Sequence, residues 1–187
     1  MKTNNRLPID ELNNLTTYIN KVVGNTRKVE TEEIIDSVED LLITAFVFGV
    51  DSISADLQTK YEVDTDKMNR IINKQIAGKV WTERITEYLQ NGGSPADINR
   101  VIDTEMMRVY NETKYDYAIN SGYNIQKRWA TMLDDKVRDT HDFLEGVSVK
   151  LTDRFYTFDN DSALYPGGFD KAENNINCRC VIEYEKI

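Results

Sequence analysis

The spacing of apolar side chains divides the chain at about Gly122. Before that glycine, apolar residues recur every three or four positions, which is typical of helices that bury one face. This spacing predicts four helices in the first two-thirds of the chain. They are expected to begin after Pro8, near Thr31, after a cap formed by Asp64 and Thr65, and at Ser94.

Glycine and proline set the expected ends of these helices. Gly49 is expected to bend or end the second helix, because glycine inside a helix costs about 1 kcal/mol relative to alanine. The third helix is expected to run unbroken over residues 68–89. Residues 91–93 (Asn-Gly-Gly) should stop it, and residues 94–97 (Ser-Pro-Ala-Asp) should start the fourth helix with a capping box.

After Gly122 the segments become short and β-prone, and turn-forming residues separate them. One short helix is expected at about residues 135–144. The expected strands cover residues 125–131, 147–151, 154–158 and 180–184. We therefore predict an α+β fold in which a helical part, residues 1–122, packs on a small α+β module, residues 123–187, with an antiparallel sheet.

Composition narrows the class of protein. The chain has 187 residues, 40% apolar and 29% charged, as in a globular protein with a core. Its net charge is −9, and no basic block stands out. Because proteins that hold nucleic acid through its phosphates need lysine and arginine, we expect weak DNA binding or none.

Neither membrane insertion nor secretion is expected. The most apolar run, residues 41–50, is about half of the roughly 20 residues that a membrane-spanning helix needs, so it predicts a buried core helix. No secretion signal is evident. The two cysteines, Cys178 and Cys180, are separated by one residue, a span too short for an unstrained disulfide. Reduced thiols in a cytosolic compartment are the expected state.

Several short motifs follow one another in the last third of the chain, in an order that resembles a known family. Upstream of them, Thr104-Glu105 and Arg108-Val109 lie on the fourth helix. The motifs are Trp129 with Asp134, Val137-Arg138 with His141, Leu144-Glu145-Gly146, Pro166-Gly167, and Asn177-Cys178-Arg179-Cys180. Together they resemble the C-terminal module of phage Mu F-like minor head proteins, over roughly residues 94–184.

Four positions depart from the family pattern. Asp103 stands where the family usually has an arginine, and Met107 where it often has a histidine. Glu145 replaces an aspartate, and Gly168 replaces an acidic residue. Any chemical role of those positions in relatives is therefore not carried over to this chain.

The resemblance implies a virion-assembly protein. Such a protein would be a minor capsid component acting in head morphogenesis, associated with the portal, in contact with capsid and scaffold proteins, and packaged in the procapsid. It could form an oligomer on the portal. We expect it in the virion, and in the host cytoplasm during assembly. It would not be an enzyme, and we assign it no catalytic residue.

An enzyme is the competing hypothesis, as a metal-dependent nuclease or a toxin-like effector delivered with the phage DNA. The polar residues that suggest it are Glu105, Arg138 and His141. If these side chains converge in an open cleft, the enzyme hypothesis gains support. If they are buried and paired, it loses support.

His141, Cys178 and Cys180 are the only histidine and the only cysteines of the chain, and all three fall within the motifs. Zinc binds such donors in a tetrahedral site. A fourth ligand would have to be a carboxylate, from Asp134 or Asp139, or a water. The alternative is that Cys180 packs in the core and His141 forms a local hydrogen bond.

Charged pairs suggest structural roles. Arg138 or Arg179 could form a bidentate pair with a neighbouring aspartate and so fix the short helix to the last strand. Glu105 and Arg108, three residues apart on a helix, are expected to form a surface ion pair. The tyrosines at the end of the fourth helix could form an interface or lie in the core; they are Tyr110, Tyr115, Tyr117 and Tyr123.

Overall fold

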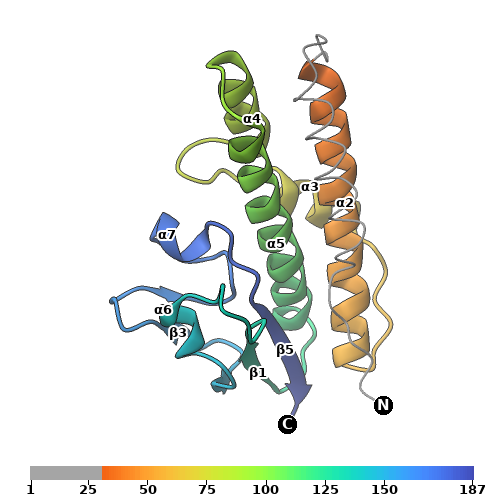
Figure 1. Ribbon diagram of the computed structural model, residues 1–187. Helices are drawn as coiled ribbons and strands as arrows, with labels where there is room; N and C mark the ends of the chain where they lie inside the picture. Colours follow the sequence, from red (N-terminus) through yellow and green to blue (C-terminus); the bar gives the residue numbers. More distant parts are fainter. Residues whose placement is uncertain (1–30) are drawn as a thin grey trace.

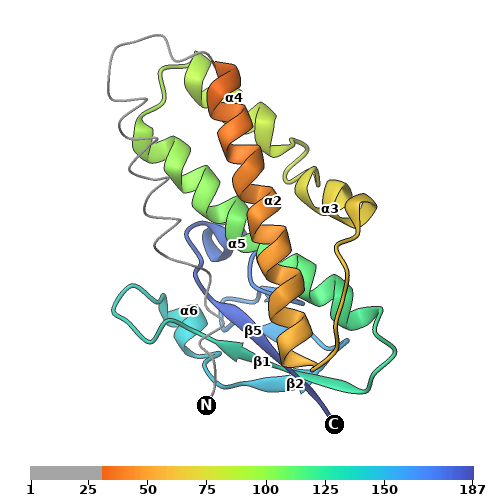
Figure 2. The same ribbon diagram turned by 90° about the vertical axis from the view of Figure 1, so that its right-hand side faces the viewer.

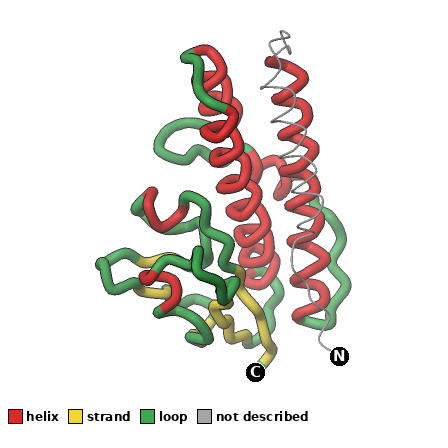
Figure 3. Tube along the Cα trace, viewed as in Figure 1, coloured by secondary structure: helices red, strands yellow, loops and turns green. Residues whose placement is uncertain are grey.

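A computed structural model describes residues 31–187 and shows long helices on one side of a small strand-containing part (Figures 1 and 3). The helix expected after Pro8 lies outside the described residues. The helices of the first part are α2 (Thr31–Asp56), α3 (Thr65–Ile72), α4 (Trp81–Gln90) and α5 (Pro95–Ile119). The predicted α+β class is confirmed, and the division into residues 1–122 and 123–187 stays a prediction.

Helices α2 and α5 lie side by side and supply much of the apolar core (Figure 1). Gly49 was expected to bend or end the second helix, and an end there is wrong, because α2 continues through it to Asp56. The reason is the close approach of the two helices. A Cβ atom at Gly49 would lie 2.8 Å from the Thr113 Cβ and 3.0 Å from the Tyr110 carbonyl oxygen. The glycine thus permits contact between the helices rather than ending one of them.

The helix expected over residues 68–89 is two helices, α3 and α4, so that prediction is wrong. Between them, Ala77 and Gly78 both have positive φ angles, and Ile76 pairs with Lys79 in a tight turn. The apolar spacing continues through the turn by coincidence, because Ile76 and Val80 occupy positions that a helix would also make apolar. The predicted start of α5 is confirmed: the Ser94 side chain accepts from the Asp97 N–H, and Pro95 is the first helical residue.

The C-terminal part contains a three-stranded antiparallel sheet in the order β2-β1-β5, at one end of the long helices (Figure 2). Its strands are β1 (Ile125–Ala130), β2 (Ser148–Lys150) and β5 (Val181–Lys186). A two-stranded sheet joins β3 (Phe155–Tyr156) to β4 (Ser162–Ala163). The short helix expected at residues 135–144 is only one turn, α6 (Asp139–Asp142), and a further turn, α7 (Ala172–Asn175), precedes β5.

Two buried polar side chains of α5 fix the last strand to the helices. Lys114 donates to the Ile182 carbonyl at 2.7 Å and pairs with Asp56 of α2 at 2.8 Å. Asn111 donates to the Cys180 carbonyl at 3.0 Å. The carboxyl end of the segment that carries both cysteines is therefore attached to α5.

Two further expectations concern exposure. In the described part of the chain, no helix is long and apolar enough to cross a membrane. Of the tyrosines near the end of α5, Tyr110 and Tyr117 are buried in the core and Tyr123 is 43% exposed. The core alternative therefore holds for the first two.

Candidate functional site

The side chains of His141, Cys178 and Cys180 meet in one buried cluster. The His141 Nδ1 atom lies 3.4 Å from the Cys178 sulfur and 3.5 Å from the Cys180 sulfur. The three ligand atoms all lie within 4.8 Å of one another, and each residue is at most 4% exposed. Chain segments more than 35 residues apart thus deliver one imidazole and two sulfurs to the same point.

A turn just before the cysteines allows both sulfurs to face the histidine. Asn177 has a φ of +55°, a conformation that asparagine tolerates better than most residues. The Cys178 N–H then donates to the Asn175 carbonyl at 3.1 Å, and residues 178–180 form no regular strand.

Aromatic rings hold the His141 imidazole in place. Trp129, from β1, meets it edge to face with centroids 5.4 Å apart, and Phe169 stacks on it at 5.2 Å. Trp129 is fully buried. The other ring nitrogen, Nε2, has no hydrogen-bond partner. The ring is therefore oriented by packing, and Nδ1 is the atom that it presents to the sulfurs.

The two thiols differ in acidity because they lie against each other. The hydrogen bond with Cys180 lowers the pKa of Cys178 well below its ordinary value, and the contact with His141 adds to this against the cost of burial. The same hydrogen bond raises the pKa of Cys180. The two thiols are therefore not equivalent.

The two motif arginines lie at the edge of the cluster and are partly exposed. Arg179 forms a bidentate pair with Asp134, at 2.7 and 2.6 Å. Arg138 donates to the carbonyls of Glu173 and Ile176, the latter at 2.5 Å. Both arginines therefore connect the segment around α6 with the segment between α7 and β5.

The expected carboxylate ligands do not join the cluster. Asp134 is engaged by Arg179, and no Asp or Glu of the described residues lies with the three ligand atoms, which also leaves Asp139 outside. Beside the ligand atoms is a hollow of about 10 Å³. The residues that line it include Lys136, Arg138 and Arg179.

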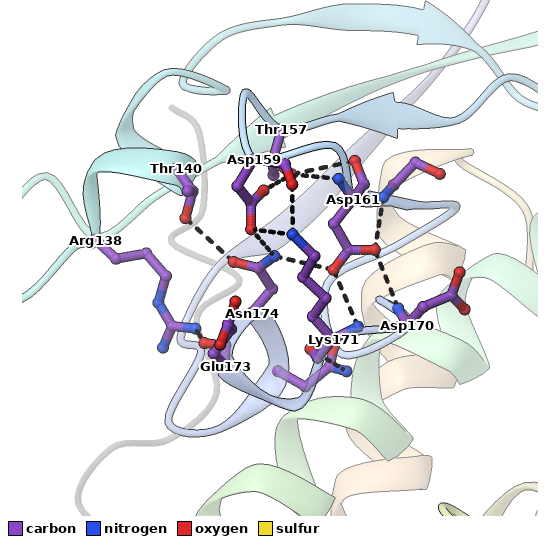
Figure 4. A network of polar contacts seen from close by, with 11 residues as sticks. Arg138, Thr140, Thr157, Asp159, Asp161, Asp170, Lys171, Glu173 and Asn174 are labelled. Carbon is purple, nitrogen blue, oxygen red and sulfur yellow. Dashed lines mark hydrogen bonds and ion pairs between the residues drawn. The ribbon is translucent and has the colours of Figure 1, made fainter.

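A polar network that the sequence did not reveal surrounds Asp161 (Figure 4). Its carboxylate accepts backbone N–H groups from Ser162, Asp170 and Lys171, at 2.8, 3.2 and 3.1 Å. The Asn174 amide donates to it at 2.9 Å. Burial opposes ionisation, but these hydrogen bonds lower the pKa of Asp161 below its ordinary value.

The network extends from Asp161 to α6. Asn174 also donates to Asp159 at 3.1 Å and lies 3.2 Å from the Thr140 hydroxyl of α6. A hydrogen bond from Thr157 lowers the pKa of Asp159 to about 2. From sequence, residues 159–161 indicated only a turn. In the structure they position α7 and hence the start of the cysteine segment.

Glu105 and Arg108 are not a surface pair, so that expectation is wrong. Both are buried, at 1% and 2% exposure, because residues 71–74, at the end of α3, cover this face of α5. Arg108 contacts Glu105 at 2.9 Å and Glu112 at 3.0 Å, and Glu105 also pairs with Arg84 at 2.8 Å. Both carboxylate oxygens of Glu105 are thus paired with arginines. Among the described residues, Glu105 shares no hydrogen-bond or ion-pair partner with His141 or Arg138.

The Pro166-Gly167 motif lies directly against α5. Gly167 has a φ of +88°, and a Cβ atom there would lie 3.0 Å from the Arg108 Cα. Only glycine satisfies both conditions without strain. The motif therefore allows the loop before α7 to pack on the helix that carries Arg108.

Glu145 and Gly146 contact the end of β1. The Glu145 carboxylate accepts from the N–H and the hydroxyl of Thr131, at 2.6 and 2.7 Å. Gly146, with a φ of +73°, donates its N–H to the Trp129 carbonyl at 2.9 Å. Glu145, which stands in place of the family's aspartate, therefore binds the end of β1 through both polar groups of Thr131.

Lys127 is a buried cation that the sequence analysis missed. It lies in β1, fully buried, and its ammonium group donates to the Leu164 carbonyl at 2.8 Å. It also lies over the rings of Tyr115 and Phe155, at 4.9 and 5.3 Å from their centroids. Burial lowers the pKa of Lys127 to about 7. A lysine normally indicates an exposed position, and the one available signal was strand alternation, which places Lys127 on the same face as Ile125 and Trp129.

Comparison with known proteins places these features in a family. The family described as Phage Mu protein F like protein matches residues 53–183, more than half of the chain. A protein of Enterococcus faecalis named NAD(+)--arginine ADP-ribosyltransferase EFV is 27% identical over 152 residues, which are 64% of this chain and 31% of that protein. Minor head protein GP7 of Bacillus phage SPP1 is 31% identical over 61 residues, which are 33% of this chain and 20% of that protein. The chain therefore spans less than a third of the length of either relative. No solved structure matches it.

Proposed function

The chain belongs to the family of phage Mu protein F-like proteins, and from this premise we propose that it is a minor head protein acting in head morphogenesis. The observation that carries the proposal is the family match over residues 53–183, which includes every motif from Glu105 to Cys180. The likeness to a phage minor head protein supports it. The expected place of the protein is the virion, and the host cytoplasm during assembly.

The finer part of the proposal is association with the portal protein, in contact with capsid or scaffold proteins. An exposed aromatic pair supports a protein contact on the C-terminal part. Phe143 and Phe158 are 64% and 61% exposed, and their rings meet edge to face at 6.3 Å. Exposed apolar side chains that gather in one place often mark interaction sites.

Co-expression with the portal protein of the same phage tests this proposal. We expect the chain to co-purify with the portal assembly, and the substitutions Phe143→Ser and Phe158→Ser together to reduce its recovery. Val63→Ser is the matched control, since Val63 is 45% exposed and lies outside the C-terminal part. A chain that is absent from purified virions, and binds neither portal nor shell, would refute the proposed function.

Contact with DNA is not required by this function. The net charge of −9 predicts weak and strongly salt-dependent binding at most. Fluorescence anisotropy with a labelled duplex at physiological salt should show no binding at micromolar protein. Micromolar or tighter affinity would contradict this expectation.

An enzyme is the second candidate, and the match to a protein named as an ADP-ribosyltransferase is what favours it. That match leaves about two-thirds of the enterococcal protein uncovered, since it spans 31% of its length. In this chain Glu105 is buried and paired with two arginines, and His141 faces the two cysteines. The arrangement that would have supported the enzyme hypothesis, Glu105, Arg138 and His141 in an open cleft, is thus not formed. Incubation with NAD⁺ and an arginine-rich acceptor discriminates the two functions: the head-protein proposal expects no release of nicotinamide.

A further inference from the structure

We propose that His141, Cys178 and Cys180 bind one zinc ion through Nδ1 and the two sulfurs. The distances carry this proposal. With zinc–sulfur bonds of about 2.3 Å and zinc–nitrogen bonds of about 2.0–2.1 Å at tetrahedral angles, nitrogen and sulfur lie about 3.6 Å apart. The observed separations are 3.4 and 3.5 Å.

Hydrogen bonding alone accounts less well for the arrangement. The ring nitrogen Nδ1 has either one lone pair or one hydrogen, so it makes one good hydrogen bond. Here two sulfurs lie at nearly equal distances from it, at 3.4 and 3.5 Å. A cation at the centre of the three atoms explains both contacts together.

The donor set selects the metal. Two thiolates and an imidazole are ligands for zinc and other soft or borderline ions, whereas magnesium and calcium require oxygen ligands. No carboxylate of the described residues joins the group. Two thiolates also balance the charge of a divalent ion, so the buried site as a whole is neutral.

The fourth ligand is a water. The hollow beside the ligand atoms has a volume of about 10 Å³. This is about the volume that one water needs. The side chains of Lys136, Arg138 and Arg179 line that hollow and can face such a water.

The position of the site indicates its role. His141 lies on α6, and the cysteines lie between α7 and β5, so the ion would close a loop between residues 37 and 39 positions apart. A metal that binds only the folded chain adds its binding free energy to folding. The zinc would therefore stabilise the C-terminal part.

Metal analysis of the untagged full-length chain is the first test, because an affinity tag of histidines would itself bind zinc. We expect about one zinc per chain. After removal of the metal by a chelator, added zinc should raise the melting temperature by roughly 8–16 °C at a thousandfold excess over the dissociation constant. Magnesium should produce no shift.

Ligand variants and cobalt identify the atoms involved. Cobalt(II) added to the metal-free chain should give a thiolate-to-metal charge-transfer band and the visible bands of a tetrahedral ion. Cys178→Ser and Cys180→Ser should each lose the full signal and the stoichiometric zinc. Asp134→Asn is the matched control: it breaks the pair with Arg179 at the edge of the site and should retain both.

Two results would overturn the proposal. One is a folded wild-type chain that holds no zinc, gives no cobalt–thiolate band and melts at the same temperature with and without chelator. The other is zinc that remains bound in the cysteine variants. If those variants fail to fold, the wild-type chain still tests whether the cysteines bind zinc, because alkylation of its two thiols must release one zinc per chain. Failure here leaves the proposed head function intact, because portal binding is measured separately.

Discussion

The clearest prediction about stability concerns Arg108, which lies at the centre of a buried ion network. Its guanidinium contacts Glu105 at 2.9 Å, Glu112 at 3.0 Å and the Ile71 carbonyl at 2.9 Å. The Arg108→Met substitution retains most of the side-chain length and removes all of these bonds. It would leave two buried carboxylates with one cation each and would remove the side-chain donor to the Ile71 carbonyl.

The magnitude follows from burial. Removing one partner of a buried ion pair costs about 3–5 kcal/mol. For a chain of this size that corresponds to a melting temperature lower by roughly 6–20 °C. The matched control is Arg128→Met, because Arg128 pairs with Glu183 on the sheet surface, where the two side chains are 44% and 50% exposed. An exposed pair contributes about 0–1 kcal/mol.

Urea denaturation followed by circular dichroism measures both variants. We expect Arg108→Met to lower the free energy of unfolding by at least about 2 kcal/mol more than Arg128→Met does. Equal losses would show that the network contributes no more than a surface pair, and the reasoning from burial would be refuted. Adding Glu105→Gln to Arg108→Met should cost less than the sum of the two single changes, because the residues share one network.

Three further predictions concern glycine, lysine and aspartate. Gly167→Ala should destabilise more than Gly122→Ala, since both have positive φ but only Gly167 meets a neighbour, Arg108; urea midpoints compare them. Because the pKa of Lys127 is lowered to about 7, the unfolded chain binds more protons above that pH, and stability should rise from pH 7 to 9. Lys127→Met should remove that slope. Because the pKa of Asp161 is lowered in the folded chain, its ionised carboxylate stabilises the fold above about pH 4, and this stabilisation is lost in more acidic solution. Asp161→Asn should weaken the acid dependence of the urea midpoint.

Local signals in the sequence were sufficient for most of the helices and strands. The Ser94-Pro95 start of α5 depends on contacts within one turn, so it could be predicted without knowledge of the fold. The β-prone residues of β1 and β5 also predicted strands there, although the pairing of these two strands is a contact between distant segments. The break at residues 73–80 could not be predicted, because Ile76 and Val80 maintain helical spacing across a turn.

The burial of charged side chains could not be predicted from the sequence. Whether Glu105 and Arg108 face solvent depends on where residues 71–74 lie, which is a tertiary contact of α5 with a distant segment. Lys127 is a different case: alternation in β1 places it on the face of Ile125 and Trp129, but only the fold brings the Leu164 carbonyl and the Tyr115 ring to its ammonium group. Asp161 indicated a turn, and only the fold brings Asn174 and the backbone of Lys171 to its carboxylate.

The family motifs have a common physical meaning when their contacts are considered together. Gly167 packs against α5, Gly146 turns the chain before β2, and Asn177 turns it before the cysteines. Each holds a connection in a conformation that few residues tolerate, and each lies next to a segment that contributes to the cluster at His141. A catalytic motif would instead place reactive groups at an open surface, whereas here the imidazole and both sulfurs are buried. We therefore interpret the motifs as the means by which a small sheet fixes its terminal strand.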